Sequence, residues 1–214
     1  MTVDKKDMLL YAITDRTWLN GDKLCNAVEK ALKGGVTFIQ LREKTLDYDE
    51  FLSEAIEINK LCKKYNVPFI INDNVDIAAK SGADGVHIGQ DDITIKEARK
   101  ILGDNKIIGV SAHNVSEALK AQNDGASYIG SGAVFTTSSK NNVSALSMDT
   151  LRKITASVDI PVVAIGGISR DNAIKLKGSG IDGLAVISAI FAQNDIENSA
   201  AELRKIADHI VNDR

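Results

Sequence analysis

Several features are scarce or missing in this sequence, and each absence narrows what the protein can be. It has no run of about 18 apolar residues and no signal peptide, so we expect a soluble cytoplasmic protein with no membrane partner. The net charge is −3 and no block of about five lysines and arginines occurs, which argues against a nucleic-acid partner. Phosphate ligands stay possible, because local Lys and Arg side chains can hold them in an acidic protein.

Cysteine and proline are also rare. The two cysteines, Cys25 and Cys62, form no CxxC pair and fall within predicted helices. We therefore expect buried thiols in a reducing cytosol rather than a disulfide or a metal site. With 2 prolines and no linker, the chain is predicted to form one domain over residues 1–214. A homo-oligomer is possible, and the sequence does not decide it.

Short β-branched apolar segments alternate with amphipathic segments along the whole chain. Capping sequences predict helix starts at Asp47, Thr94 and Asn114, and a further helix is expected from Asp171. The apolar segments predict eight strands, at residues 9–13, 36–41, 69–71, 85–88, 107–110, 126–129, 161–165 and 183–187.

An internal echo accompanies this alternation: GGVTFIQL, SGADGVHI, DGASYIGS and SGIDGLAV begin at residues 34, 81, 124 and 179. In each, a glycine follows a helix end, where the left-handed conformation favours glycine, and a strand begins shortly after. The eight alternating strand and helix units together predict an α/β fold, a single (β/α)8 TIM barrel. The alternative is an open doubly wound sheet, but the first strand is not followed by GxGxxG, and the strand ends are polar throughout.

Residues 69–92 contain two short strands joined by a helical segment, which predicts a parallel βαβ unit. The first strand ends at Asn72-Asp73-Asn74 and the second at Gln90-Asp91-Asp92. Both clusters should lie at the carboxyl ends of neighbouring strands, where α/β folds place their ligands. An acid at each of two adjacent strand ends can supply two carboxylates to one hard cation.

Other strand ends carry groups suited to phosphate. QLREK from residue 40 offers an amide, a guanidinium and an ammonium, and FTTSSK from residue 135 offers four hydroxyls and one cation. Either segment could instead be a solvated surface loop. Gly166-Gly167 after the seventh strand, with a short helix opening at Ile187-Ser188 after the eighth, matches the recurrent phosphate site of barrels. The alternative is that these glycines serve only to form a turn.

The three histidines indicate less. His87 lies in a strand between two apolar residues, so we expect a packed core imidazole. His113 follows a strand end and could line a site, and His209 near the end of the last helix is expected to be exposed. No Ser-His-Asp or Cys-His arrangement can be argued from their order.

Several of these segments together resemble one family over nearly the whole chain. They are TDR from residue 14, QLREK from 40, IND from 71, GADGVHIGQDD from 82, GVSAHN from 109, AIGGI from 164 and VIS from 186. In this order and spacing they resemble the thiamine-phosphate synthase family. The resemblance implies a TIM-barrel transferase that joins a pyrimidinylmethyl diphosphate to a thiazole phosphate and releases pyrophosphate through a pyrimidinylmethyl cation. Its partners would be small phosphorylated heterocycles.

The resemblance also implies site residues, carried over motif by motif. Asp73 and Asp92 would hold Mg²⁺, and Lys44, Ser111 and Lys140 would be catalytic. The pyrimidine diphosphate would be bound by Gln40, Leu41, Arg42, Glu43, Lys44, Asn72, Ser111 and Lys140. The thiazole phosphate would be bound by Thr137, Ser138, Ser139, Gly167, Ile187 and Ser188.

The sixth loop departs from the family pattern. The family reads F-P-T-x-T-K, whereas here Thr136 follows Phe135 and Ser139 replaces the second threonine. Serine keeps the hydroxyl, but the rigidity that proline gives the loop is lost. Two other functions stay open: a thiazole tautomerase of the same fold, which needs neither diphosphate nor metal, and a non-catalytic sensor of a phosphorylated ligand.

Overall fold

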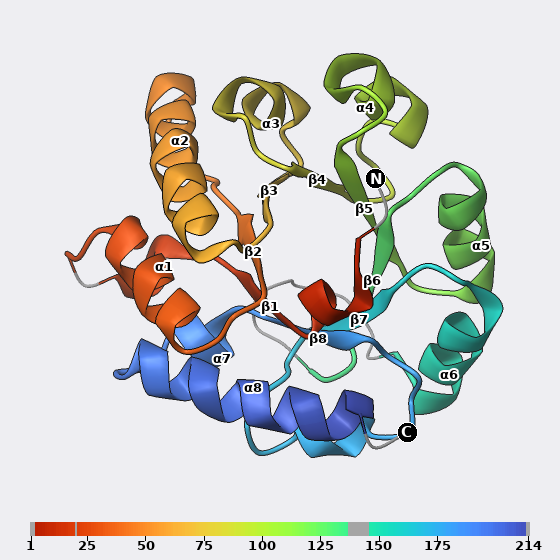
Figure 1. The fold of residues 1–214 in the computed structure, drawn as a ribbon. Helices are drawn as coiled ribbons and strands as arrows, with labels where there is room; N and C mark the ends of the chain where they lie inside the picture. Colours follow the sequence, from red (N-terminus) through yellow and green to blue (C-terminus); the bar gives the residue numbers. More distant parts are fainter. Residues whose placement is uncertain (1–2, 20, 137–145, 213–214) are drawn as a thin grey trace.

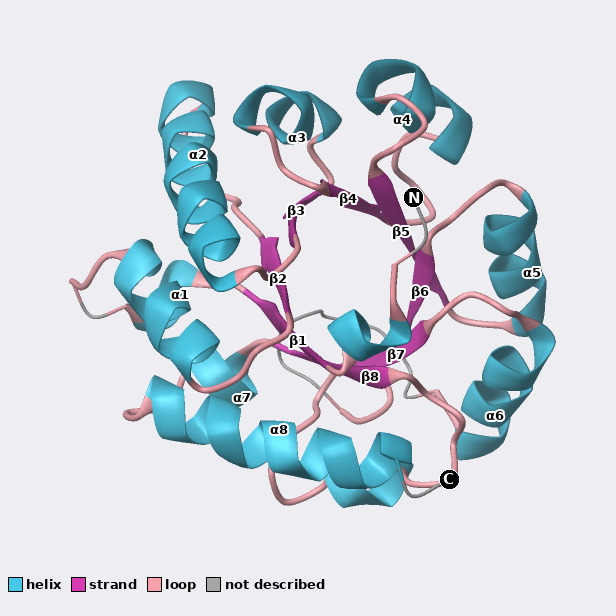
Figure 2. Ribbon diagram, in the orientation of Figure 1, coloured by secondary structure: helices cyan, strands magenta, loops and turns pink. Residues whose placement is uncertain are grey.

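The computed structural model describes residues 3–19, 21–136 and 146–212. Eight parallel strands pair in chain order and close into a barrel, and the helices form a ring around it (Figures 1 and 2). The strands are β1 (Leu10–Ile13), β2 (Phe38–Leu41), β3 (Phe69–Asn72), β4 (Gly85–Ile88), β5 (Ile107–Ala112), β6 (Tyr128–Gly132), β7 (Val162–Ile165) and β8 (Gly183–Val186). The predicted (β/α)8 barrel is confirmed, and the open sheet is wrong.

The described helices follow the strands. They are α1 (Leu24–Lys33), α2 (Tyr48–Tyr65), α3 (Val75–Ser81), α4 (Ile95–Leu102), α5 (Val115–Asn123), α6 (Met148–Ser157), α7 (Ser188–Phe191) and α8 (Ile196–Asn212). The predicted caps are confirmed: the side chains of Asp47, Thr94 and Asn114 each accept a hydrogen bond from a backbone N–H three residues on. These contacts fix where α2, α4 and α5 begin.

The internal echo has a common structural cause. Its glycines Gly35, Gly82, Gly125 and Gly180 have φ values of 93°, 71°, 95° and 83°, which other residues rarely adopt. Two residues after each glycine lies a polar side chain that accepts a hydrogen bond from the backbone of the previous strand in the chain. The donor is the N–H of the first residue in β1, β3 and β7, and of the second residue in β5. These acceptors are Thr37, Asp84, Ser127 and Asp182. The residue directly before each even-numbered strand is thus hydrogen-bonded to the odd-numbered strand that precedes it in the chain.

The segment between β7 and β8 differs from its prediction. In place of a helix from Asp171, the structure has the short 3-10 helix η3 (Ala173–Leu176), which packs against α8. The Asn172 amide accepts from Ser169 N and donates to Gly167 O, both at 2.8 Å, which holds a turn before η3. Gly178, with φ of 75°, follows and prevents the helix from continuing.

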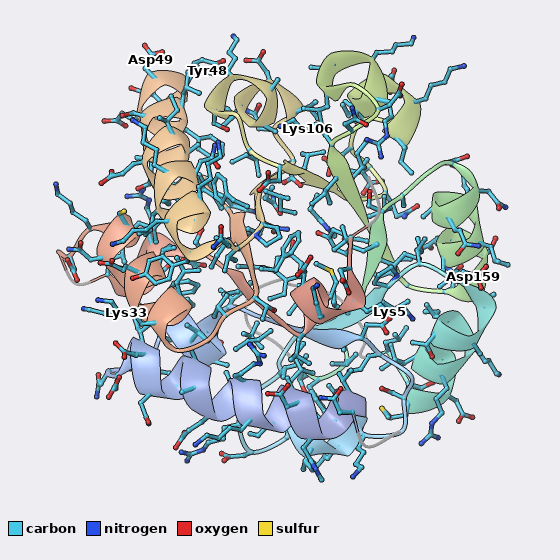
Figure 3. The ribbon with its side chains drawn as sticks, viewed as in Figure 1. Lys5, Lys33, Tyr48, Asp49, Lys106 and Asp159 are labelled. Atoms are coloured by element: carbon cyan, nitrogen blue, oxygen red, sulfur yellow. The ribbon has the colours of Figure 1, made fainter. Side chains whose placement is uncertain are left out.

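The amino-terminal end of the barrel is closed by a short 3-10 helix, η1 (Lys5–Met8), drawn in red over the barrel in Figure 1. Met8 is fully buried and packs inside the barrel with Tyr11 and Phe38. In Figure 3, Lys5 lies on η1 over this end, and its ammonium lies 3.2 Å from the Asp182 carboxylate. In the described part of the chain, η1 thus covers this end of the barrel, and the cavity lined by strand ends lies at the opposite end.

Lys33, Tyr48, Asp49 and Asp159 lie at the outer edge of the helix ring (Figure 3). None of the helices in the described ranges is long and apolar enough to cross a membrane.

Candidate active site at the carboxyl ends of the strands

The carboxyl ends of the strands surround a cavity of about 130 Å³. Residues at the ends of β2, β5, β6, β7 and β8 line it. Among them are five that the sequence singled out: Arg42, Ser111, Gly167, Ile187 and Ser188. The fold therefore brings parts of both predicted subsites to one cavity, although up to 146 residues separate them along the chain.

Alternate residues at the end of β2 point in opposite directions. Gln40 is 2% exposed, and its amide nitrogen donates to the Tyr11 hydroxyl at 2.5 Å. The Leu41 side chain is fully buried in the layer between the barrel and the helices. Only the backbone of Leu41 can contact a ligand in the cavity.

Arg42 and Lys44 offer positive charge at the same strand end. The backbone N–H of Arg42 donates to Thr14 Oγ1 at 2.9 Å, and its guanidinium lies 3.5 Å from the Asp15 carboxylate. The loop after β1 therefore positions Arg42 against the cavity. Lys44 is exposed, two residues further on.

Glu43 faces a different partner. Its carboxylate accepts two hydrogen bonds from Arg16 Nε at 2.7 and 2.9 Å, and its side chain is only 3% exposed. Arg16 also donates to Glu54 of α2 at 2.9 Å. Burial raises the pKa of Glu54, and the charge of Arg16 opposes that rise. Arg16 thus links the loop after β1 to the loop after β2 and to α2. Both oxygens of the Glu43 carboxylate accept from Arg16.

The two predicted metal ligands lie at the ends of β3 and β4. Asp73 is exposed, has a φ of 61°, and donates its backbone N–H to His87 O at 2.8 Å. Asp92 is exposed, and its carboxylate accepts from Gly89 N at 2.6 Å. The backbone of Asp73 is thus held by β4, and the carboxylate of Asp92 by Gly89, the residue after β4. In the described ranges, no three His, Cys, Asp or Glu side chains form a metal cluster, at this place or any other.

Ser111 and His87 form part of a row of hydrogen bonds inside the barrel, which is fully buried only at its tyrosines. The row runs from Gln40 to Tyr11, to Tyr128 Oη at 2.7 Å, to His87 Nδ1 at 2.8 Å, and from His87 Nε2 to Ser111 Oγ at 3.0 Å. His87 faces the barrel interior, as a core imidazole would, but it is half-buried and linked to a cavity residue. Asn72 lies opposite His87 in the β3–β4 register.

The glycines after β7 are required by a neighbouring loop. Gly166 and Gly167 have φ values of 98° and 65°. A Cβ on Gly167 would lie 2.4 Å from Thr136 O, and one on Gly166 would lie 2.5 Å from the Ala133 Cα. The loop after β6 packs directly on these glycines, so turn and packing requirements already explain them. Ile187 precedes α7, and Ser188, its first residue, is exposed.

Some predicted residues lie outside the described ranges, namely Thr137, Ser138, Ser139 and Lys140. The remaining histidines are both exposed. His113 lines the cavity and contacts Glu117 at 3.0 Å, and the predicted exposure of His209 is confirmed.

Sequence reasoning missed Tyr11 and Tyr128. Both are fully buried inside the barrel and contact residues of the predicted site. A signal was available, because each tyrosine occupies an inward-facing position of its strand, as Gln40 and His87 do. A tyrosine hydroxyl in that layer needs a hydrogen-bond partner.

The fold and the cavity define a barrel enzyme whose polar groups gather at the carboxyl ends of its strands. Comparison with known proteins then identifies the particular family. Residues 10–190 match the model of the thiamine monophosphate synthase family. The thiamine-phosphate synthase of Ruminiclostridium cellulolyticum is 51% identical over 202 residues, covering 94% of this chain and 96% of that protein. That of Clostridium botulinum is 47% identical, covering 97% of each.

A solved structure agrees with these relatives. The thiamine phosphate pyrophosphorylase of Pyrococcus furiosus superposes with a TM-score of 0.89 at 40% identity, covering 97% of this chain and 98% of that chain. The chain belongs to the thiamine monophosphate synthase family and is an enzyme of the transferase class.

Proposed function

We propose that the protein condenses 4-amino-2-methyl-5-pyrimidinylmethyl diphosphate with 4-methyl-5-(2-phosphoethyl)thiazole to give thiamine phosphate and pyrophosphate, with Mg²⁺ bound by Asp73 and Asp92. One observation carries the proposal: Arg42 and Ser111 line the same cavity as Gly167, Ile187 and Ser188. A diphosphate on the first pair would face a thiazole phosphate on the second group. The names of the relatives give the product, thiamine phosphate, and the family resemblance supplies the two substrates.

The donor set at Asp73 and Asp92 fits Mg²⁺. This ion takes oxygen ligands, and proteins often hold it with one or two carboxylates while substrate phosphate oxygens and water complete the shell. The two exposed carboxylates lie at neighbouring strand ends, and Gly89 N fixes one of them. When bound, Mg²⁺ would neutralise charge on the diphosphate.

The side chains of the cavity would favour departure of the diphosphate. The C–O bond breaks first, and its electron pair leaves with the diphosphate. Arg42 and Lys44 supply positive charge where negative charge builds up, and Ser111 lies within the same cavity to donate a hydrogen bond. By family resemblance, Lys140 would add a further cation.

The thiazole nitrogen then donates its lone pair to the pyrimidinylmethyl carbon, which forms the C–N bond. This sequence needs positioning more than acid–base chemistry. Holding both fragments in one cavity can lower the barrier by about 7–11 kcal/mol. The glycine-lined wall would admit the thiazole phosphate close to the backbone, and Ser188 would donate to it.

Pyrophosphate release from the purified protein tests the proposal. We expect release only when both phosphorylated heterocycles and Mg²⁺ are present. Asp92→Asn should abolish it at ordinary Mg²⁺ concentrations. Binding of the thiazole phosphate without any release would contradict the synthase function and favour a tautomerase or a sensor. Release that is unchanged by a chelator would remove Mg²⁺ from the proposal.

We place this reaction in a reducing compartment such as the cytoplasm. Cys62 is buried and Cys25 is half-buried. Burial, with Glu57 nearby, raises the pKa of Cys25 to about 11, so its thiol stays protonated and unreactive at neutral pH. Thiol titration of the native and unfolded protein tests this, with two free thiols expected only after unfolding.

A further inference from the structure

The row of hydrogen bonds inside the barrel joins the two sides of the pyrimidine diphosphate subsite. It starts at Gln40 on β2, passes through Tyr11, Tyr128 and His87, and ends at Ser111 on β5. We call these five side chains the interior relay. Only its two ends are residues that the family resemblance assigns to the substrate. The three members between them have no role in the reaction described above.

The chemistry of its first member gives the relay a direction. The Gln40 amide nitrogen can only donate, so the Tyr11 oxygen accepts. Within the described part of the chain, the Tyr11 hydroxyl otherwise bonds only to Tyr128, so its proton is donated there. Tyr128 has then accepted one hydrogen bond, and its own proton goes to His87 Nδ1.

The direction of the relay fixes the tautomer of His87. A neutral imidazole with Nδ1 as the acceptor carries its proton on Nε2. This N–H donates to Ser111 Oγ at 3.0 Å. Ser111 Oγ therefore accepts from His87, and its own O–H can donate a hydrogen bond to a ligand in the cavity that Ser111 lines. If the relay ran the other way, Ser111 would donate to His87 and offer the cavity only an acceptor.

Packing and burial hold the two tyrosines in this arrangement. Tyr11, Phe38 and Tyr128 form a cluster of edge-to-face rings with centroids 4.8–5.8 Å apart. A Cβ on Gly109 would lie 2.1 Å from the Tyr128 ring, so only glycine leaves room for that ring. Burial raises the pKa of both tyrosine hydroxyls well above 10.0, so both keep their protons at working pH.

We propose that Tyr11, Tyr128 and His87 are positioning residues that set the hydrogen-bond polarity of the substrate subsite. They turn the Ser111 hydroxyl into a donor for a diphosphate oxygen and leave the Gln40 carbonyl oxygen as an acceptor for the amino group of the pyrimidine. This inference rests on the proposed function for the identity of the ligand. The polarity itself is a property of the protein without ligand.

The free acceptor at the Gln40 end agrees with this assignment. In the described part of the chain, Gln40 donates its amide N–H to Tyr11, and its carbonyl oxygen makes no hydrogen bond. One end of the relay thus accepts and the other donates, which matches an amino group and a diphosphate on one substrate.

The tautomer of His87 in the ligand-free enzyme is the first test. Nitrogen-15 NMR at neutral to mildly alkaline pH distinguishes the two neutral tautomers, and His87→Gln identifies the His87 signals by their loss. We expect the Nε2–H tautomer in the wild type and a mixture in Tyr11→Phe, because that variant removes the group that fixes the direction. A wild-type Nδ1–H tautomer would overturn the inference. So would an unchanged tautomer in Tyr11→Phe.

A kinetic cycle is the second test. Tyr11→Phe should lower kcat/KM for the pyrimidine diphosphate about fivefold, the effect of one ordinary hydrogen bond, and leave KM for the thiazole phosphate unchanged. In a Ser111→Ala background the same change should have a clearly smaller effect, because only its influence on Gln40 remains, whereas independent sites would show the full effect again. Equal effects in both backgrounds would overturn the inference, because Tyr11 would then not act through Ser111.

Ser131→Ala is the matched control. Ser131 is also fully buried in the barrel wall, and its hydroxyl donates to Ala112 O at 3.0 Å, outside the relay. This variant should lose similar stability and leave both KM values and the His87 tautomer unchanged. The NMR measurement needs no substrate, so it decides on the relay even if pyrophosphate release fails and the proposed function with it.

Discussion

The two halves of the cavity are built from different parts of the chain. The half formed by β2 to β5 presents side chains: Arg42, Ser111 and His113 line the cavity. Asp73 and Asp92 follow the neighbouring strands β3 and β4 but do not line it. The half formed by β6 to β8 presents glycines at four lining positions, 130, 132, 166 and 167, beside apolar side chains and Ser188. We call these the side-chain half and the backbone half.

This difference predicts how each half fails. Under the proposed function, the side-chain half would act through groups that a substitution removes. The backbone half would act through space and N–H groups that a substitution blocks. Truncation should therefore be the damaging change in the first half, and adding a single methyl group should be the damaging change in the second.

The largest effect should come from Asp92→Asn in the side-chain half. Asparagine keeps an oxygen that can accept from Gly89 N but removes the charge that a divalent cation needs. We expect turnover to fall by at least about 100-fold at ordinary Mg²⁺ and to recover partly at higher Mg²⁺. Asp91→Asn, at the exposed neighbouring acid, is the control. Near-normal turnover of Asp92→Asn would remove Asp92 from the metal site.

The next effect should come from Gly167→Ala in the backbone half. Its Cβ would lie 2.4 Å from Thr136 O, so the loop after β6 must shift. We expect kcat/KM for the thiazole phosphate to fall about 10- to 100-fold. Gly178→Ala is the control, because Gly178 also has a positive φ but nothing lies within 4 Å of its added Cβ. Both variants should lose about 1–3 kcal/mol of stability from backbone strain. Equal kinetics in both would contradict a role for this wall.

Glu43 and Lys44 are adjacent in sequence but should behave differently. Glu43→Gln weakens two hydrogen bonds to Arg16, and we expect it to lower the free energy of unfolding by about 1–2 kcal/mol with a small change in kcat. Lys44→Met removes an exposed cation and should lower kcat without changing stability. Urea denaturation and steady-state kinetics on both variants measure this. The reverse pattern would make Glu43, rather than Lys44, the substrate contact.

The smallest effect is a loss of stability at alkaline pH. Burial raises the pKa of Tyr11 and Tyr128 above 10.0, so below about pH 10 these hydroxyls are neutral in both the folded and the unfolded state. Above that pH the unfolded state loses their protons and is favoured, so the free energy of unfolding should fall. Denaturation at about pH 8 and about pH 11 measures the loss, and Tyr11→Phe/Tyr128→Phe should reduce it. An equal loss in that double variant would assign it to other groups.

Much of the fold could be predicted because its signals are local. The capping side chains at Asp47, Thr94 and Asn114 act on N–H groups three residues away. The glycines of the internal echo satisfy a backbone requirement at their own position. The segment after Asp171 was mispredicted because Asn172 bonds to Gly167 and Ser169, which turns the chain before a helix can form.

In the candidate site, too, local features could be predicted and long-range contacts could not. Its strand-end residues could be found from the sequence, because parallel strands bring their carboxyl ends to one edge whatever their pairing partners are. The partners of those residues could not be found. Glu43 directly follows Arg42 in the sequence, yet its carboxylate contacts Arg16. Arg42 contacts Asp15 instead.

The sequence by itself determined the eight strands, their order, the caps and the polar residues at the strand ends, because each depends on neighbours a few positions away. Only the tertiary structure decided which side chains meet inside the barrel. Tyr11 and Tyr128 lie 117 positions apart, and their hydroxyls touch because closure and strand register place both inside one barrel. Register is a property of all eight strands together, so no local segment encodes that contact.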